Sequence, residues 1–299
     1  IAEGQLAQAE AELARLRAGA TPETMAALRA QRAQAEAVLA AAEANLAAAQ
    51  DKIDAVVIGT PDHVHAPAGM LAMKLGKHCY CEKPLTHSVY EARALADAAR
   101  EHRVATQMGN QGHSAESTAQ IRDWIKAGSI GKVTEVIGYS RKNYGTLVRP
   151  VQGSVIPKTL DWNVWLNRAE EIPFSKSYLN REWIRFSHFS GVIGDMATHI
   201  LDPANYSLEL GAPISVEAEV LEKHRRFPGA LPIAGVITWE FAARGDQPPV
   251  TMKYYLGTDI EFPRPAHLDA DQPMIGAGSF LVGEKGSIQA GSHSQGSRL

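Results

Sequence analysis

The stretch Ile53-Asp54-Ala55-Val56-Val57-Ile58-Gly59-Thr60-Pro61 decides the fold of this 299-residue chain. It is a short β-branched run that ends in turn residues, which is typical of a buried strand in a parallel sheet. Residues 66–75 then show a helical pattern. Two further strand-like segments, at 78–81 and 104–108, alternate with helical segments. This alternation predicts a doubly wound parallel sheet.

After residue 132 the pattern changes to successive strands with little helix between them. The expected strands are 133–140, 215–220, 234–241, 250–256, 280–282 and 287–290. Strands that follow one another in this way indicate a mostly antiparallel sheet. The prediction for the whole chain is therefore an α/β fold, with a parallel sheet followed by an α+β domain.

Residues 1–50 differ sharply from the rest, because two residues in five are alanine. The segment Gly19–Glu23 breaks this run, and Pro22 suits the first position of a second helix. We therefore expect an N-terminal helical hairpin, which resembles the coiled-coil hairpin of periplasmic adaptor (membrane fusion) proteins. Both a purely structural hairpin and a partner-binding element remain open. The expected domains are residues 1–50, 51–132 and 133–299, with the last one truncated at its C-terminus.

Composition excludes several classes of protein. A formal net charge of −3 and the absence of a basic block argue against a nucleic-acid partner. No uninterrupted apolar run is long enough for membrane insertion. Cys79 and Cys81 are the only cysteines, so a disulfide framework is excluded and a reducing compartment is favoured. We expect a cytoplasmic protein, and an exported form stays open because the chain begins at Ile1 rather than Met.

A second stretch, Gly194-Asp195-Met196-Ala197-Thr198-His199-Ile200-Leu201-Asp202, carries the candidate chemistry. On a helix, Asp195, His199 and Asp202 share one face. A carboxylate one turn from an imidazole suits a general base. The alternatives are a helix cap with a core histidine, or a metal-binding trio, but no supporting His or Cys cluster favours a metal. Pro203 lacks an N–H and predicts a kink near His199.

The motifs together resemble the Gfo/Idh/MocA family of oxidoreductases, the glucose–fructose oxidoreductase and inositol dehydrogenase type, from about residue 51 to the end. The resemblance rests on residues 57–66 (Val-Ile-Gly-Thr-Pro-Asp-His-Val-His-Ala), on Glu82-Lys83-Pro84-Leu85 and on the Gly194–Asp202 stretch. Supporting pieces are residues 108–114, 161–166 and 182–185. Their order and spacing together are specific.

The resemblance implies an NAD- or NADP-dependent enzyme that oxidises a sugar, cyclitol or polyol hydroxyl. Lys83, Asp195 and His199 would be catalytic: His199 accepts the hydroxyl proton, Lys83 stabilises the developing charge, and Asp195 orients His199. The expected cofactor contacts are Gly59, Thr60, Pro61, His63, His65, Glu82 and Asn110, with both histidines on the loop after a central strand. The expected substrate contacts are His113, Trp183 and Arg185.

One expected feature of a dinucleotide fold is missing from the sequence. A Gly-x-Gly-x-x-Gly loop after the first strand should bind the pyrophosphate, yet the alanine-rich segment occupies its place. We therefore expect a partial Rossmann-like sheet without its first strands, and weakened cofactor binding. The alternatives are an NAD-dependent glycoside hydrolase that oxidises its substrate transiently, and a non-catalytic chimera that binds a partner through the hairpin. The expected partners are a small sugar or polyol and a second copy of the chain, joined through the antiparallel sheet.

Overall fold

The computed structural model describes residues 7, 10, 11, 22–142, 149–220, 227, 229–258, 260–268 and 271–299. The chain divides into two compact units, Ile1–Val56 and Val57–Leu299. The first contains helix α2 (Pro22–Gln50), so the helix start predicted at Pro22 is confirmed. The first half of the expected hairpin falls largely outside the described residues. Glu10 lies 3.9 Å from Arg32 of α2.

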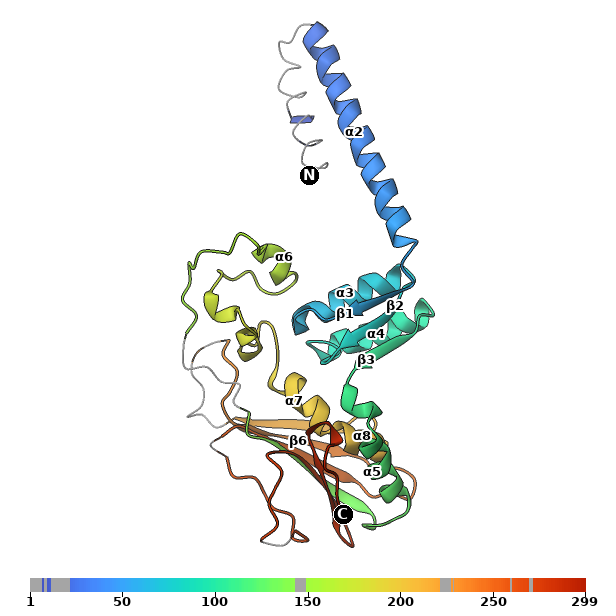
Figure 1. Cartoon of the computed structure of the whole chain (residues 1–299), viewed down its shortest axis with the longest axis vertical. Coiled ribbons are helices and arrows are strands. Elements are labelled where there is room, and N and C mark those ends of the chain that lie inside the picture. The colour runs from blue at the N-terminus through green and yellow to red at the C-terminus, as the bar shows by residue number, and fades with distance from the viewer. Residues whose placement is uncertain are drawn as a thin grey trace. The chain divides into compact units, whose positions relative to one another are not determined.

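The parallel sheet has three strands in the order β1-β2-β3 (Figure 1). They are β1 (Ala55–Ile58), β2 (His78–Glu82) and β3 (Thr106–Gly109). Strands β2 and β3 run parallel. Helices α3 (Asp62–Lys74) and α4 (Val89–Glu101) connect them, and α4 begins with a capping box between Ser88 and Glu91.

Two expectations about the first strand are wrong. β1 is the edge strand of this sheet and not a central one, and only one of its faces is covered: Ile58 is 3% exposed, whereas Val57, which points to the other face, is 76% exposed. A β-branched run looks the same in both positions, so the sequence could not separate them. Helix α3 also begins at Asp62, four residues earlier than expected. His63 and His65 therefore lie in its first turn rather than on a loop.

The second sheet has six strands in the order β5-β6-β7-β4-β8-β9. Among the described strands of this sheet, β4–β7 is the one parallel pair, so the mostly antiparallel sheet is confirmed. The strands are β4 (Val133–Ser140), β5 (Ser215–Val220), β6 (Gly235–Phe241), β7 (Val250–Leu256), β8 (Ala277–Gly283) and β9 (Ser287–Gly291). A 3₁₀ turn, η5 (Ser292–Ser294), follows β9.

Three helices supply apolar residues to the cores along this sheet. They are α5 (Glu116–Lys126), α7 (Val192–Ile200) and α8 (Asp202–Leu208). Ile121 of α5 and Ala204 of α8 are buried in one cluster with strand residues. Ile200 of α7 is fully buried in another with Tyr254, and burial of one such side chain contributes about 1.5–3 kcal/mol. These cores fix α7, which carries Asp195 and His199.

Gly138 in the middle of β4 lets the α7–α8 junction lie close to the sheet. A Cβ at this position would be 2.5 Å from Leu201 Cδ2 and 3.2 Å from Tyr254 Cδ2. The helix is interrupted at Leu201, since α7 ends at Ile200 and α8 starts at Asp202. This is the position at which Pro203 removes a helical hydrogen bond.

The segment between β4 and α7 folds around aromatic side chains. It contains α6 (Trp162–Leu166) and two 3₁₀ turns, η2 (Lys176–Tyr178) and η3 (Glu182–Arg185). Trp162 is buried with Phe189 and stacks on Trp165, with ring centroids 4.8 Å apart. Within the described residues, no helix is long and apolar enough to cross a membrane.

Candidate active site

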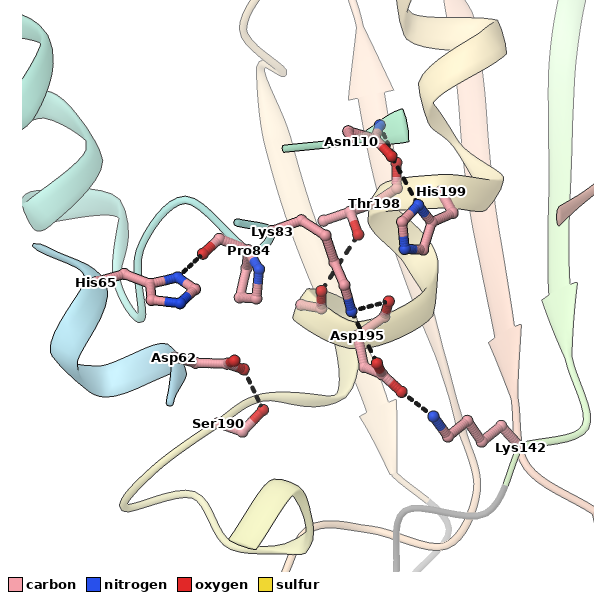
Figure 2. A network of polar contacts seen from close by, with 11 residues as sticks. Asp62, His65, Lys83, Pro84, Asn110, Lys142, Ser190, Asp195, Thr198 and His199 are labelled. Carbon is pink, nitrogen blue, oxygen red and sulfur yellow. Dashed lines mark hydrogen bonds and ion pairs between the residues drawn. The ribbon is translucent and has the colours of Figure 1, made fainter. Parts of the chain in front are cut away.

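Lys83 and Asp195 form the centre of the site. Lys83 follows directly after β2, and Asp195 lies in the first turn of α7. The Lys83 ammonium donates to both the backbone oxygen and Oδ1 of Asp195, each at 2.9 Å (Figure 2). Both side chains are largely buried, and Asp195 is only 6% exposed. The two motifs that the sequence singled out are therefore joined directly.

Lys142, just after β4, contacts the other carboxylate oxygen of Asp195. Burial alone would raise the pKa of Asp195, but hydrogen bonds from Lys142 and Lys83 outweigh it and lower that pKa to about 2. The carboxylate is therefore ionised at neutral pH. It holds two cations rather than acting as a base.

His199 lies one helical turn after Asp195, but its hydrogen-bond partner is Asn110. Nδ1 of His199 is 2.6 Å from Oδ1 of Asn110, and the ring stacks on His293 with centroids 4.0 Å apart. Burial, and then the nearby His293 and Lys83, lower the pKa of His199 to about 4, against the opposite effect of Asp195. Asp195 is hydrogen-bonded to Lys83 and Lys142, whereas His199 is hydrogen-bonded to Asn110. An orienting role of Asp195 toward His199 therefore stays a prediction.

A pocket of about 400 Å³ opens at the carboxyl ends of β1 and β2. This size suits a small ligand or part of a larger one. Lys83 and Asp195 line it, together with Gly59, Thr60, Pro61, Asp62, His65, Glu82, Arg181, Trp183 and Ile184. A Cβ on Gly59 would meet no described atom within 4 Å, so this wall has free space beside the backbone.

Two polar groups build the floor of this pocket. His65 is 1% exposed, and its ring nitrogens lie 2.6 Å from the Pro84 carbonyl and 2.8 Å from the Thr60 carbonyl. It thereby ties the turn after β1 to the turn after β2. Burial raises the pKa of Asp62, although Ser190 donates a 2.6 Å hydrogen bond to its carboxylate.

Two related family descriptions match most of the chain. Residues 3–110 match the family described as "Oxidoreductase family, NAD-binding Rossmann fold", and residues 117–242 match its C-terminal alpha/beta domain. This chain belongs to the Gfo/Idh/MocA oxidoreductase family. The first match includes residues 3–50, which the sequence resemblance had left out. The likeness of those residues to coiled-coil adaptor hairpins stays a prediction.

Several Gfo/Idh/MocA relatives are dehydrogenases. Levoglucosan dehydrogenase of Pseudarthrobacter phenanthrenivorans is 29% identical over 52% of this chain and 33% of its own length. The NAD(+)-type scyllo-inositol 2-dehydrogenase of Bacillus subtilis is 36% identical over 30% of this chain and 26% of its own length. This chain therefore spans about a third or less of the length of these relatives.

A solved structure gives the same fold. An inositol dehydrogenase homolog from Azotobacter vinelandii, complexed with NAD+, superposes with a TM-score of 0.55. The match covers 80% of this chain and 52% of that one, at 18% identity. The two-domain architecture of the Gfo/Idh/MocA family is therefore present in part.

The pocket fits one end of the family's dinucleotide. Free space beside Gly59, polar groups on Thr60 and Glu82, and the Lys83 ammonium suit a nicotinamide with its ribose. The start of α3 suits a pyrophosphate less well, because the buried Asp62 carboxyl occupies its first turn. The described residues therefore fit the nicotinamide end of the cofactor.

Several predicted contacts lie away from this pocket. His63 is 3.0 Å from the Trp165 carbonyl and packs on Phe189. His113 pairs with Asp202 at 3.0 Å, and Arg185 pairs with Glu182. Asn110 binds His199, so its side chain is engaged within the protein. Of the expected substrate contacts, Trp183 alone lines the pocket.

The sequence also left important residues unrecognised. Lys142 and His293 approach the site from the second sheet, and neither belongs to a recognised motif. Arg181 reaches the pocket from a left-handed backbone position with φ of 68°, and an isolated arginine in a loop carries no such signal. Among the described residues, no group of three or more His, Cys, Asp or Glu side chains could hold a metal.

Proposed function

We propose that this chain forms the nicotinamide-facing and proton-transfer part of an oxidoreductase that uses NAD or NADP. Its substrate is a hydroxyl of a sugar, cyclitol or polyol. The observation that carries the proposal is the Lys83 ammonium, which is held by ionised Asp195 in the wall of a pocket at the carboxyl ends of two strands. Ligands of open α/β sheets bind at this edge.

The cofactor would be held at its nicotinamide end by Gly59, Thr60, Pro61 and Glu82, which line the pocket. When bound, a nicotinamide supplies hydride acceptance from the alcohol carbon. We infer no contact for the pyrophosphate from the described residues. Because the ribose-binding residue of the family pattern has no counterpart here, NAD and NADP both remain candidates.

Lys83 would donate a hydrogen bond to the reacting hydroxyl oxygen. This bond strengthens as negative charge develops on that oxygen, which lowers the barrier to oxidation. Asp195 supports this role because it holds the ammonium from two directions. Lys142 shares the carboxylate and adds a second positive charge beside the site.

His199 would be the final acceptor of the hydroxyl proton. Its imidazole is neutral above about pH 4, as a base must be. The ring does not line the described pocket; in Figure 2, Lys83 and Asp195 lie between His65 of the pocket floor and His199. Lys83 would therefore relay the proton: its ammonium gives one proton to the neutral imidazole, and the resulting amine takes the proton of the hydroxyl.

The substrate class is proposed from the relatives. Their names state levoglucosan and scyllo-inositol as substrates, and both compounds carry secondary hydroxyls on a ring. Arg181 and Trp183 line the pocket. They could contact the remaining hydroxyls and the apolar face of such a ring.

Calorimetric titration with NAD+, NADH, NADP+ and NADPH tests cofactor binding. Saturable binding of one pair at micromolar concentration supports the proposal, whereas a folded protein that binds none of the four contradicts it. A Gly59→Leu variant should lose binding because its side chain fills the free space. Gly276→Leu is the matched control, since its Cβ also meets no described atom and it lies outside the pocket.

Product analysis with polyols and glycosides separates the two enzymatic alternatives. Net formation of reduced cofactor supports a dehydrogenase. Release of an aglycone without net change in cofactor indicates the glycoside hydrolase instead.

We further propose that two copies associate through the antiparallel sheet. The edge strand β5 is almost entirely exposed, and Val216 is 57% and Ile214 72% exposed. Exposed apolar edge strands favour pairing with another chain. Light scattering should give a dimer or larger species that Val216→Lys dissociates, whereas a monomeric wild type contradicts the proposal.

A further inference from the structure

Two residues from distant parts of the chain touch His199. Asn110 lies directly after β3, and His293 belongs to η5 after β9. The Asn110 side chain is 5% exposed and meets the edge of the imidazole. His293 covers its face, with an interplanar angle of 28°.

The hydrogen bonds of Asn110 determine which nitrogen of His199 carries the proton. The amide nitrogen Nδ2 of Asn110 donates to the Thr198 carbonyl at 3.2 Å, and a carbonyl oxygen can only accept. With Nδ2 on the Thr198 carbonyl, Oδ1 faces His199 and must accept a hydrogen bond from Nδ1–H. The lone pair of the neutral imidazole is then on Nε2.

The segment that carries His293 is fixed by buried contacts. The Thr118 hydroxyl donates to the Gly112 carbonyl at 2.7 Å and is hydrogen-bonded to the Ser294 hydroxyl at 2.6 Å, and Thr118 is fully buried. A Cβ on Gly112 would be 2.8 Å from His293 Cα, so glycine permits this close approach. His293 and Ser294 both have left-handed φ angles, 60° and 61°. Such angles cost energy, and they persist where the surroundings determine them.

We propose that Asn110 and His293 are positioning residues that hold His199 as a neutral imidazole protonated on Nδ1, with Nε2 as the proton-accepting nitrogen. The use of Nε2 in catalysis rests on the proposed function, whereas the tautomer does not. Asn110 then serves His199 and not the cofactor.

The charged groups around His199 agree with a neutral ring. Lys83 faces it from the end of β2, Lys142 from the end of β4, and His293 from η5. All three disfavour an imidazolium, and Asp195 in α7 is the group that favours one. A neutral ring with a fixed lone pair accepts a proton without first losing one or reorienting.

Nitrogen-15 NMR of the imidazole rings tests the tautomer on the full chain without any need for turnover. His199→Gln identifies the His199 signals. We expect a protonated Nδ1 and an unprotonated Nε2 at neutral pH in the wild type. A protonated Nε2, or two equally populated tautomers, would overturn the proposal.

Asn110 variants test the cause of this tautomer. Asn110→Asp keeps an acceptor for Nδ1 and should keep Nδ1 protonated. Asn110→Leu removes the acceptor, so Nδ1 should no longer be the preferred site of the proton. Asn163→Leu, on the exposed side of α6, is the matched control and should change nothing. A folded Asn110→Leu variant with the wild-type tautomer contradicts the role of Asn110.

His293 variants test the stacking contact. His293→Ala should raise the pH at which His199 titrates and lower kcat several-fold with little change in KM. His293→Phe keeps a ring face and should restore kcat. Unchanged His199 signals and kcat in His293→Ala contradict the role of His293. If the chain shows no turnover, the proposed function fails, but the NMR results still decide the tautomer.

Discussion

The ammonium of Lys83 is bound at 2.9 Å to both the backbone and the side chain of Asp195, a residue 112 positions further along the chain. This double contact joins the end of β2 to the first turn of α7. The contact places the Lys83 ammonium in the pocket wall, where the ionised Asp195 carboxylate holds it in position. The two residues therefore act as one unit.

Replacement of Lys83 tests this unit directly. We expect Lys83→Met to lower kcat for alcohol oxidation by about 10²–10³-fold, because the developing oxyanion loses a preorganised donor. The affinity for nicotinamide dinucleotide should change much less. Steady-state kinetics and calorimetry measure the two quantities. Lys74→Met, at the exposed end of α3, is the control, and an equal loss in both variants would contradict the role of Lys83.

Gly194 controls how closely α7 approaches the turn after β2. A Cβ at Gly194 would be 2.8 Å from Pro84 Cγ, so Gly194→Ala must push Pro84 and the neighbouring Lys83 away from Asp195. We expect kcat to fall at least tenfold, with a loss of about 1–3 kcal/mol in the free energy of unfolding from overpacking. Urea denaturation and steady-state kinetics measure these changes.

Gly191→Ala is the matched control for Gly194→Ala. Gly191 is the N-cap of the same helix, and a Cβ there meets no described atom within 4 Å. We expect wild-type kcat in this variant. If Gly191→Ala reduces kcat as much as Gly194→Ala, the contact with Pro84 is not responsible for the loss.

The low pKa of Asp195 makes stability depend on pH in the acid range. Folding lowers this pKa from 3.8 to about 2, so the unfolded chain takes up the proton at a higher pH than the folded one. The stability that Asp195 contributes is present above pH 5 and is lost as the pH falls toward 2, on the order of 2 kcal/mol.

Comparison with Asp195→Asn isolates this effect. The difference in free energy of unfolding between wild type and variant should shrink between pH 5 and pH 2, as measured by urea denaturation at each pH. A difference that stays constant over this range would show that the lysines do not stabilise the ionised carboxylate.

The sequence predicted the parallel sheet, the mostly antiparallel sheet and the meeting of the Lys83 and Asp195 motifs. The two sheets follow from periodicity, whereas the meeting of the two motifs was implied by the family resemblance. Sequence could not place Lys142 beside Asp195, because that contact depends on how α7 packs over β4. Nor could it separate the exposed Val57 from a buried strand residue, since both belong to the same β-branched pattern.

The roles of polar residues near His199 were the hardest to predict. Asn110 follows a strand in the expected cofactor-binding region, so its position suggested a ligand contact. Its actual partner, His199, is 89 residues away. The helix spacing of Asp195 and His199 likewise suggested a bonded pair, but two lysines compete for the carboxylate.

The pH dependence of catalysis should report the unusual environment of His199. An ordinary histidine has a pKa of 6.5, whereas burial and the nearby His293 and Lys83 lower the pKa of His199 to about 4. Alcohol oxidation needs the neutral form, so protonation of His199 should reduce kcat/KM only as the pH falls toward 4. We expect no loss from this group between pH 7 and pH 5. A fall in kcat/KM centred near pH 6.5 that disappears in His199→Gln would contradict this assignment. A His199 NMR titration centred near pH 4 would agree with it.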